Sequence, residues 1–293
     1  MTTEDIHIGG RPSRSAREIA LWLIIACILA AGIGWSWSPT PFAQALAALF
    51  IGCALVHAGA FYGPRQALVL FTLCIAITFA MENLGAATGF PFGNYHFVVD
   101  SGLPRVGTIP VIVGPLWFGA GYFSWIVASI LLNGAARRLG RPFDFIALPV
   151  VAALVMTQWD LVMDRSESTI AKAWIWHDGG ADFGVPLTNY LGWLLTSWLF
   201  FQAFAFYLRR ELRPPPPTAK QSRKLQAIAV LFYVSLGLTH IVPWAMGQSG
   251  EIIDAAGKVW QIHDLREMSV VVMLFTMLFT GLLAALRLAR SKR

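Results

Sequence analysis

Long apolar runs constrain the fold of this chain more than any other feature. Eight runs can be marked, each close to the roughly 20 residues that a helix needs to cross the hydrocarbon core of a bilayer. They cover residues 18–37, 42–60, 66–83, 108–133, 144–163, 184–207, 225–245 and 267–287. Of the 293 residues, 56% are hydrophobic and only 13% are charged, which excludes an ordinary soluble domain and a disordered chain. The sequence predicts an all-α, polytopic membrane helical bundle of about eight transmembrane helices, with seven as the alternative.

The basic residues predict the orientation of this bundle. With eight spans, all but five of the 22 Lys and Arg residues fall on one side. The five on the other side are Arg105, Arg165, Lys172, Lys258 and Arg266. Because cytoplasmic loops are enriched in Lys and Arg, both termini are expected in the cytoplasm, and the protein in the bacterial inner (cell) membrane. This distribution accounts for the net charge of +6 without a nucleic-acid partner.

A single membrane domain is the simplest organisation. We expect a cytoplasmic N-terminal segment at 1–17, a transmembrane domain at 18–287 and a cytoplasmic tail at 288–293. No small-residue cleavage pattern clearly follows the first run, which is therefore expected to be an anchor and not a cleaved signal. The basic cytoplasmic loop at 209–224 contains four successive prolines, which favour a stiff, extended spacer. Cys27, Cys53 and Cys74 lie inside apolar runs, so no disulfide is expected.

Two acidic residues at the end of the fifth run are the first functional candidates. Asp160 and Asp164 are four residues apart, so a helix places them on one face. An ionised side chain at the bilayer centre costs roughly 2.5–3.5 kcal/mol, so such a pair needs partners, protons or a water-lined cavity. The alternative is that both reach the headgroups and only end the span. Eleven of the 16 acidic residues fall in the outer half, so chemistry is expected near that face.

Further polar candidates gather on the same side. Glu82 ends the third run and precedes a loop rich in Gly, Pro and aromatic residues that contains Tyr95 and His96. This composition suits a shaped lid, or alternatively a compact loop packed on the bundle. Asn189 lies inside the sixth run, where an amide needs a partner. The alternative to a functional role for Asn189 is a hydrogen bond that only joins two helices.

Aromatic and histidine candidates complete the set. Trp174 and Trp176 precede His177 near the outer face, where tryptophans often serve only as interfacial anchors. His240 lies near the outer end of the seventh run, and an intramembrane histidine is more often hydrogen-bonded than a ligand.

The motifs that are absent favour chemistry without a cofactor or metal. The six histidines never form HxxxH or HExxH, and the sequence has no Walker loop, no GxSxG and no dinucleotide-binding fingerprint. A carboxylic acid buried among apolar groups can instead protonate an alkene. Aromatic faces stabilise the resulting cation by about 0.5–2 kcal/mol per contact. Capture by water gives hydration, whereas loss of a different proton gives isomerisation or cyclisation.

Three motifs, ENLGAATGFPFGNYHF, WDLVMD and FGVPLTNYLGW, point to a known family. In order and spacing they resemble those of the carotenoid biosynthesis membrane family, which includes CruF-type carotenoid 1',2'-hydratases and bisanhydrobacterioruberin hydratases. The resemblance covers roughly residues 45 to 290. It implies an integral-membrane enzyme that adds water across the terminal 1,2 double bond of a linear carotenoid end group, giving a tertiary alcohol.

Carried onto this chain, the family pattern assigns its polar positions to four residues. These catalytic candidates are Glu82, Asp160, Asp164 and Asn189. We expect Asp160 or Glu82 to donate the proton, and Asp164 with Asn189 to position the water. The substrate-binding candidates are Tyr95, His96, Trp159, Trp174, Trp176, His177, Trp193 and His240. Where the family continues with proline after the second aspartate, this chain has Arg165, which we expect to form an ion pair with Asp164 and to favour a base or structural role for that aspartate.

The expected partners are a hydrophobic carotenoid or other isoprenoid substrate, water, membrane lipid and other carotenoid biosynthesis enzymes. Two alternatives stay open. The first is a carotenoid or other isoprenoid cyclase or isomerase that uses the same proton donor. The second is a lipid or pigment transporter or binding protein, although the paired halves with interrupted helices that transporters often show are not evident here.

Overall fold

The computed structural model describes residues 40–98, 104–137, 139–211 and 219–290. The predicted first span at 18–37, the segment 1–17 and Cys27 lie outside these residues, as do the four successive prolines of the 209–224 loop and the end of the 288–293 tail. Cys53 and Cys74 are buried, and they are not joined in a disulfide.

Helices occupy the other seven predicted runs. The long helices are α2 (Thr40–Tyr62), α3 (Pro64–Thr88), α4 (Val113–Leu131), α5 (Pro142–Asp164), α6 (Leu187–Arg210) and α7 (Ala219–Leu238). The last run holds α9 (Ile262–Met273), the π-helical η3 (Leu274–Leu278) and α10 (Phe279–Arg290) in one continuous stretch. Shorter pieces are α8 (Ile241–Ala245), the 3-10 turn η1 (Ala135–Arg137) and the π-helical η2 (Arg165–Ile170).

Six of these helical stretches, counted within the described residues, are long and apolar enough to cross a membrane. They are Pro64–Thr88, Val113–Leu131, Pro142–Ile170, Leu187–Arg210, Arg223–Ala245 and Ile262–Arg290. The predicted all-α, polytopic membrane bundle is confirmed. The total of eight spans and the side on which the termini lie stay predictions.

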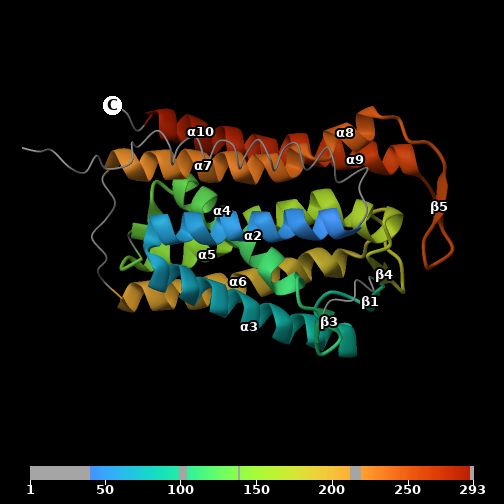
Figure 1. The fold of residues 1–293 in the computed structure, drawn as a ribbon, viewed down its shortest axis with the longest axis horizontal. Helices are drawn as coiled ribbons and strands as arrows, with labels where there is room; N and C mark the ends of the chain where they lie inside the picture. Colours follow the sequence, from blue (N-terminus) through green and yellow to red (C-terminus); the bar gives the residue numbers. More distant parts are fainter. Residues whose placement is uncertain (1–39, 99–103, 138, 212–218, 291–293) are drawn as a thin grey trace, which may run out of the picture.

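The helices run side by side along the long axis of the molecule, with α7 and α10 along one flank and α3 and α6 along the other (Figure 1). Between them, α4 is the core helix, since 89% of its apolar stretch is buried. Small residues let its neighbours approach closely. A Cβ at Gly114 would lie 2.7 Å from the Phe79 ring of α3, and one at Gly121 would lie 3.1 Å from the Phe200 ring of α6.

Polar side chains inside the bundle join helices that are distant in sequence. His57 of α2 is 2.7 Å from the Tyr122 hydroxyl of α4 and 2.9 Å from the Leu225 carbonyl oxygen of α7. The Trp125 indole N–H donates to the Tyr62 hydroxyl at 2.8 Å. Such bonds are required because hydrocarbon offers buried polar groups no alternative partner.

Three pairs of short strands lie together at one end of the bundle (Figure 1). β1 (Tyr95–Phe97) pairs with β4 (Trp174–Trp176), β2 (Arg105–Val106) with β3 (Ile109–Pro110), and β5 (Glu251–Ile253) with β6 (Val259–Gln261), all antiparallel. The β1–β4 pair joins the loop after α3 to the loop after η2. It thereby joins the first of the motifs that carry the family resemblance to the segment between the second and the third.

Candidate active site

The register of the β1–β4 pair determines which side chains of the two loops lie next to one another. Its register pairs Tyr95 with Trp176, His96 with Ile175, and Phe97 with Trp174. Alternate residues of a strand point to opposite faces, and paired residues share a face. Tyr95, Phe97, Trp174 and Trp176 therefore lie on one face, and all four line the same pocket.

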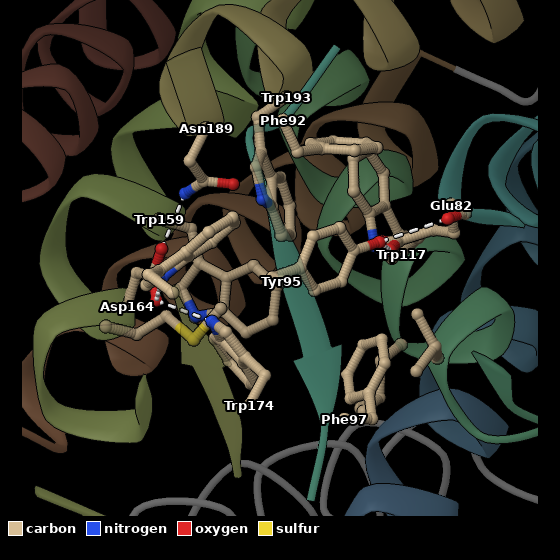
Figure 2. A pocket seen from close by; sticks show the side chains of 14 residues that line it. Glu82, Phe92, Tyr95, Phe97, Trp117, Trp159, Asp164, Trp174, Asn189 and Trp193 are labelled. Carbon is tan, nitrogen blue, oxygen red and sulfur yellow. Dashed lines mark hydrogen bonds between the residues drawn. The ribbon is translucent and has the colours of Figure 1, made fainter. Parts of the chain in front are cut away.

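This reaction pocket has a volume of about 90 Å³ and is mainly aromatic. Figure 2 shows its side chains converging from α3, α4, α5, α6 and the β1–β4 pair. Its 14 lining residues are Glu82, Phe92, Tyr95, Phe97, Val113, Leu116, Trp117, Trp159, Met163, Asp164, Trp174, Trp176, Asn189 and Trp193. Three of the four catalytic candidates are among them, as are five of the eight substrate-binding candidates.

Asp164 accepts hydrogen bonds from three N–H groups. The Asn189 amide nitrogen donates to Oδ2 at 2.5 Å, and the indoles of Trp174 and Trp176 donate to Oδ1 at 2.9 and 3.4 Å. The side chain of Asp164 is fully buried. Trp174 and Trp176 are therefore not only interfacial anchors, because both orient a carboxyl group inside the bundle.

Asp160 takes part in this cluster from outside the pocket lining. It shares a face of α5 with Asp164, as the four-residue spacing predicts, and its Oδ2 accepts the second hydrogen of the Asn189 amide at 2.8 Å. Among the described residues, no partner lies within hydrogen-bonding distance of its buried Oδ1. Asn189 thus bridges two fully buried carboxyl groups, and its amide oxygen points the other way, toward Trp193 (Figure 2).

Glu82 lies across the pocket from Asp164 (Figure 2). The Tyr95 hydroxyl donates to Glu82 Oε2 and lies 3.1 Å from the backbone carbonyl oxygen of Glu82. Burial raises the pKa of the Tyr95 hydroxyl far above its usual value, and the neighbouring Glu82 carboxyl group adds to this effect. Tyr95 therefore keeps its proton and acts as a donor to Glu82.

Stacked aromatic rings form the wall between the two carboxyl groups. Trp117 and Trp193 stack with centroids 3.8 Å apart, and the edge of Trp159 meets Trp193 at 5.7 Å. Phe92 enters beside them because two glycines leave room for its ring. A Cβ at Gly85 would lie 2.7 Å from that ring, and one at Gly192 would collide with it.

Arg165 does not form the expected ion pair with Asp164. Its Nε and Nη2 donate to the two carboxyl oxygens of Asp182, at 3.1 and 2.6 Å, and the Tyr190 hydroxyl donates to the same Asp182 at 2.5 Å. Arg165 directly follows Asp164, and adjacent residues of a helix do not face each other, so its side chain points away from the face that carries Asp164. The prediction is wrong for this reason, and the hydrogen bonds to the Asp164 carboxyl oxygens come from the neutral side chains of Trp174, Trp176 and Asn189.

Three substrate-binding candidates lie outside the reaction pocket. His96 is on the opposite face of β1, where it is exposed and its Nδ1 lies 2.9 Å from Nε2 of the exposed His177. His240 precedes α8 and is also absent from the lining. Within the described residues, no group of three or more His, Cys, Asp or Glu side chains is placed to hold a metal ion.

Six lining residues were not among the sequence candidates. They are Phe92, Phe97, Val113, Leu116, Trp117 and Met163. Phe97 follows from the alternation that starts at Tyr95, and Phe92 from its place in the Gly, Pro and aromatic loop. Trp117 stands in a run of apolar residues and carries no distinguishing signal.

Comparisons with known proteins agree with the motifs. A family described as carotenoid biosynthesis protein matches residues 40–259, which include every residue of the pocket. The bisanhydrobacterioruberin hydratase of Haloarcula japonica is 31% identical over 158 residues, 52% of this chain and 50% of that protein, so the match spans about half the length of the curated relative. No solved structure matches the chain. Since the family match extends over most of the sequence, this chain belongs to the carotenoid biosynthesis protein family.

Proposed function

We propose that this membrane protein hydrates the terminal 1,2 double bond of a linear carotenoid end group without a cofactor. The family supports a carotenoid-modifying membrane enzyme, and the name of the relative supports a hydratase. The observation that carries the proposal is that two carboxyl groups, Glu82 and Asp164, line one aromatic pocket from different helices. An addition of water needs this combination of an acid, a base and a surface that tolerates a cation.

The carotenoid end group reaches the pocket from the lipid. Phe97, Val113 and Leu116 are apolar, line the pocket and are only half-buried, so they form the edge that a hydrocarbon chain crosses. A space of about 90 Å³ is far below the roughly 300–1,000 Å³ of pockets that enclose a drug-sized ligand. The pocket therefore holds the terminal end group, and the rest of the polyene stays outside.

Glu82 is the proton donor in this proposal. Its proton adds to carbon 2 of the double bond, and the positive charge develops at carbon 1, which carries two methyl groups. The faces of Trp117, Trp159 and Trp193 stabilise this tertiary cation. Tyr95 holds the Glu82 side chain in position through its hydroxyl.

Asp164 and Asn189 direct the water. A water molecule beside them attacks carbon 1, and a new carbon–oxygen bond forms as the water transfers one proton to Asp164. Return of a proton to Glu82 closes the cycle, so the reaction consumes one water and releases one tertiary alcohol. Asp160 supports this arrangement by accepting the second Asn189 hydrogen.

Expression in a bacterium that accumulates lycopene tests the proposal. The expected result is a new carotenoid heavier by one water, identified by liquid chromatography and mass spectrometry. A product of unchanged mass and altered absorption would support the cyclase or isomerase alternative. Absence of any new product, with the protein present in the membrane, would support binding or transport.

A further inference from the structure

A second pocket adjoins the reaction pocket and differs from it in chemistry. This polar pocket has a volume of about 140 Å³ and lies among η2, β4, the loop at Gly184 and the β5–β6 hairpin. Its polar lining residues are Ser168, Thr169, Lys172 and Asp254. Its volume is enough for several water molecules, and its polar groups can hold them.

The two pockets have one lining residue in common. Trp176 lines both of them, and its indole N–H contacts Asp164 Oδ1 at 3.4 Å. This contact is long for an N–H to oxygen hydrogen bond, which usually measures about 2.7–3.2 Å. The Trp174 contact to the same oxygen is 2.9 Å, so a small displacement of Trp176 leaves Asp164 with its stronger indole donor.

A residue of the polar pocket is also hydrogen-bonded to the backbone of Asp164. Ser168 lines it and donates from its hydroxyl to the Asp164 carbonyl oxygen at 2.8 Å. The strands β4 and β5 place it at the end of the bundle where the strand pairs gather (Figure 1). This is the end that the charge distribution assigns to the outer aqueous face.

The proposed reaction needs such a supply of water. The walls of the reaction pocket are mainly aromatic, so water can be held only at its few polar groups. Its edge at Phe97, Val113 and Leu116 is apolar and half-buried. We propose that the polar pocket is a water-binding site that delivers the reactant water to Asp164 past Trp176. This inference rests on the proposed hydration.

The composition of the products reports on water delivery. Once carbon 2 is protonated, the cation is either captured by water, giving the alcohol, or loses a proton from a neighbouring carbon, giving an isomer of unchanged mass. Blocking the polar pocket removes the water and leaves the proton donor in place. The ratio of hydrated product to isomer must then fall.

The polar pocket is best blocked after the protein has folded in the membrane. Ala255 lines the polar pocket and is exposed, so the full-length Ala255→Cys variant in isolated membranes can be modified with a bulky maleimide. The matched control is Ala181→Cys, because Ala181 is exposed in the loop between β4 and α6 and lines neither pocket. Unsubstituted protein treated with the reagent controls for the native cysteines.

We expect modification at Ala255→Cys to lower the ratio of alcohol to isomer about tenfold, equivalent to about 1.4 kcal/mol in activation free energy. Modification at Ala181→Cys and treatment of the unsubstituted protein should leave the ratio unchanged. An unchanged ratio after complete modification at Ala255→Cys, an equal fall at Ala181→Cys, or failure of the maleimide to reach Ala255→Cys would overturn the water site. Absence of alcohol from the unmodified protein would instead refute the hydratase proposal itself.

Discussion

Asp164 shows how a single carboxyl group can be fixed inside a membrane protein. Its three N–H donors come from β4 and α6, and each hydrogen bond to a charged group is worth about 1.5–3 kcal/mol. These bonds compensate for placing a carboxyl group among aromatic rings. The cluster therefore requires both the β1–β4 pair and the start of α6 to be formed.

Replacing Asp164 by asparagine should stop hydration and leave the protein in the membrane. In Asp164→Asn one carboxyl oxygen becomes an NH₂ group, which must face an indole or amide donor and cannot take a proton from water. We expect turnover to fall by about 10²- to 10⁴-fold, the usual contribution of a general base. The measurement is alcohol formed per unit of immunodetected membrane protein.

Asp178→Asn is the matched control for that change. Asp178 is exposed at the same end of the molecule, where it accepts a hydrogen bond from Asn94 at 2.6 Å, and it does not line the reaction pocket. Its replacement should leave turnover intact. Equal activity of the two variants would remove Asp164 from the mechanism.

Glu82→Gln should also abolish turnover, because an amide retains the shape of the side chain and has no acidic proton to give. The control is Glu211→Gln, which removes a carboxylate at the C-terminal end of α6 that pairs with Arg65 at 3.1 Å. The measurement is the amount of alcohol formed by membranes that contain equal amounts of each variant. Full activity of Glu82→Gln would transfer the donor role to Asp160, the other acid expected from the sequence.

At the level of elements, the helices were predictable and the strand pairs were not. The apolar runs locate α2 to α7 and the α9–α10 stretch within a few residues, because twenty apolar residues in succession admit few structures other than a membrane helix. Paired residues of the three-residue strands β1 and β4 are 77 to 81 positions apart in the sequence, and segments this short carry little propensity of their own. Their pairing depends on the helices that bring their loops together.

The candidate site was likewise predictable only in part. Local spacing placed Asp160 and Asp164 on one face of α5, and the polar character of Glu82 and Asn189 in apolar runs marked them as needing partners. The position of His96 depends on a strand register, and the partner of Arg165 depends on the loop that places Asp182 beside it. Neither has a clear signal in the sequence. His96 therefore lies outside the pocket, and Arg165 pairs with Asp182.

Gly192→Ala should destabilise the junction between α6 and the loop that carries Phe92. A methyl group at this position collides with the Phe92 ring, and overpacking a filled site costs about 1–3 kcal/mol. We expect a lower Tm in detergent and reduced turnover, because Phe92 lines the reaction pocket. Gly59→Ala is the control, since a Cβ on that glycine of α2 meets nothing within 4 Å and alanine favours a helix by roughly 0.5–1 kcal/mol. A Tm for Gly192→Ala as high as that for Gly59→Ala would contradict the packing.

For the molecule as a whole, the candidate site and the arginines at the ends of α6 and α10 lie at opposite ends of the bundle. The strand pairs, of which β1 and β4 line the reaction pocket, lie at one end (Figure 1). The ends of α6 and α10 that carry Arg209, Arg210, Arg287 and Arg290 lie at the other. By the positive-inside rule we expect the pocket to open near the outer leaflet. The reaction is thus expected on the side of the membrane opposite the basic loops.

Cysteine accessibility in whole cells tests this orientation. Lys258→Cys, on the β5–β6 hairpin, should react with an impermeant maleimide in cells with a permeabilised outer envelope. Gly140→Cys, in the exposed turn before α5, should react only after the inner membrane is opened. The reverse pattern would place the active site on the cytoplasmic side.

The origin of the added atoms tests the central claim, acid-catalysed hydration, most directly. Membranes containing the protein are supplied with a linear carotenoid in D₂O, and in a parallel reaction in water enriched in ¹⁸O. The account predicts one non-exchangeable deuterium at carbon 2 and one ¹⁸O at carbon 1 of the alcohol. An alcohol without deuterium on carbon, or with oxygen derived from O₂, would contradict it.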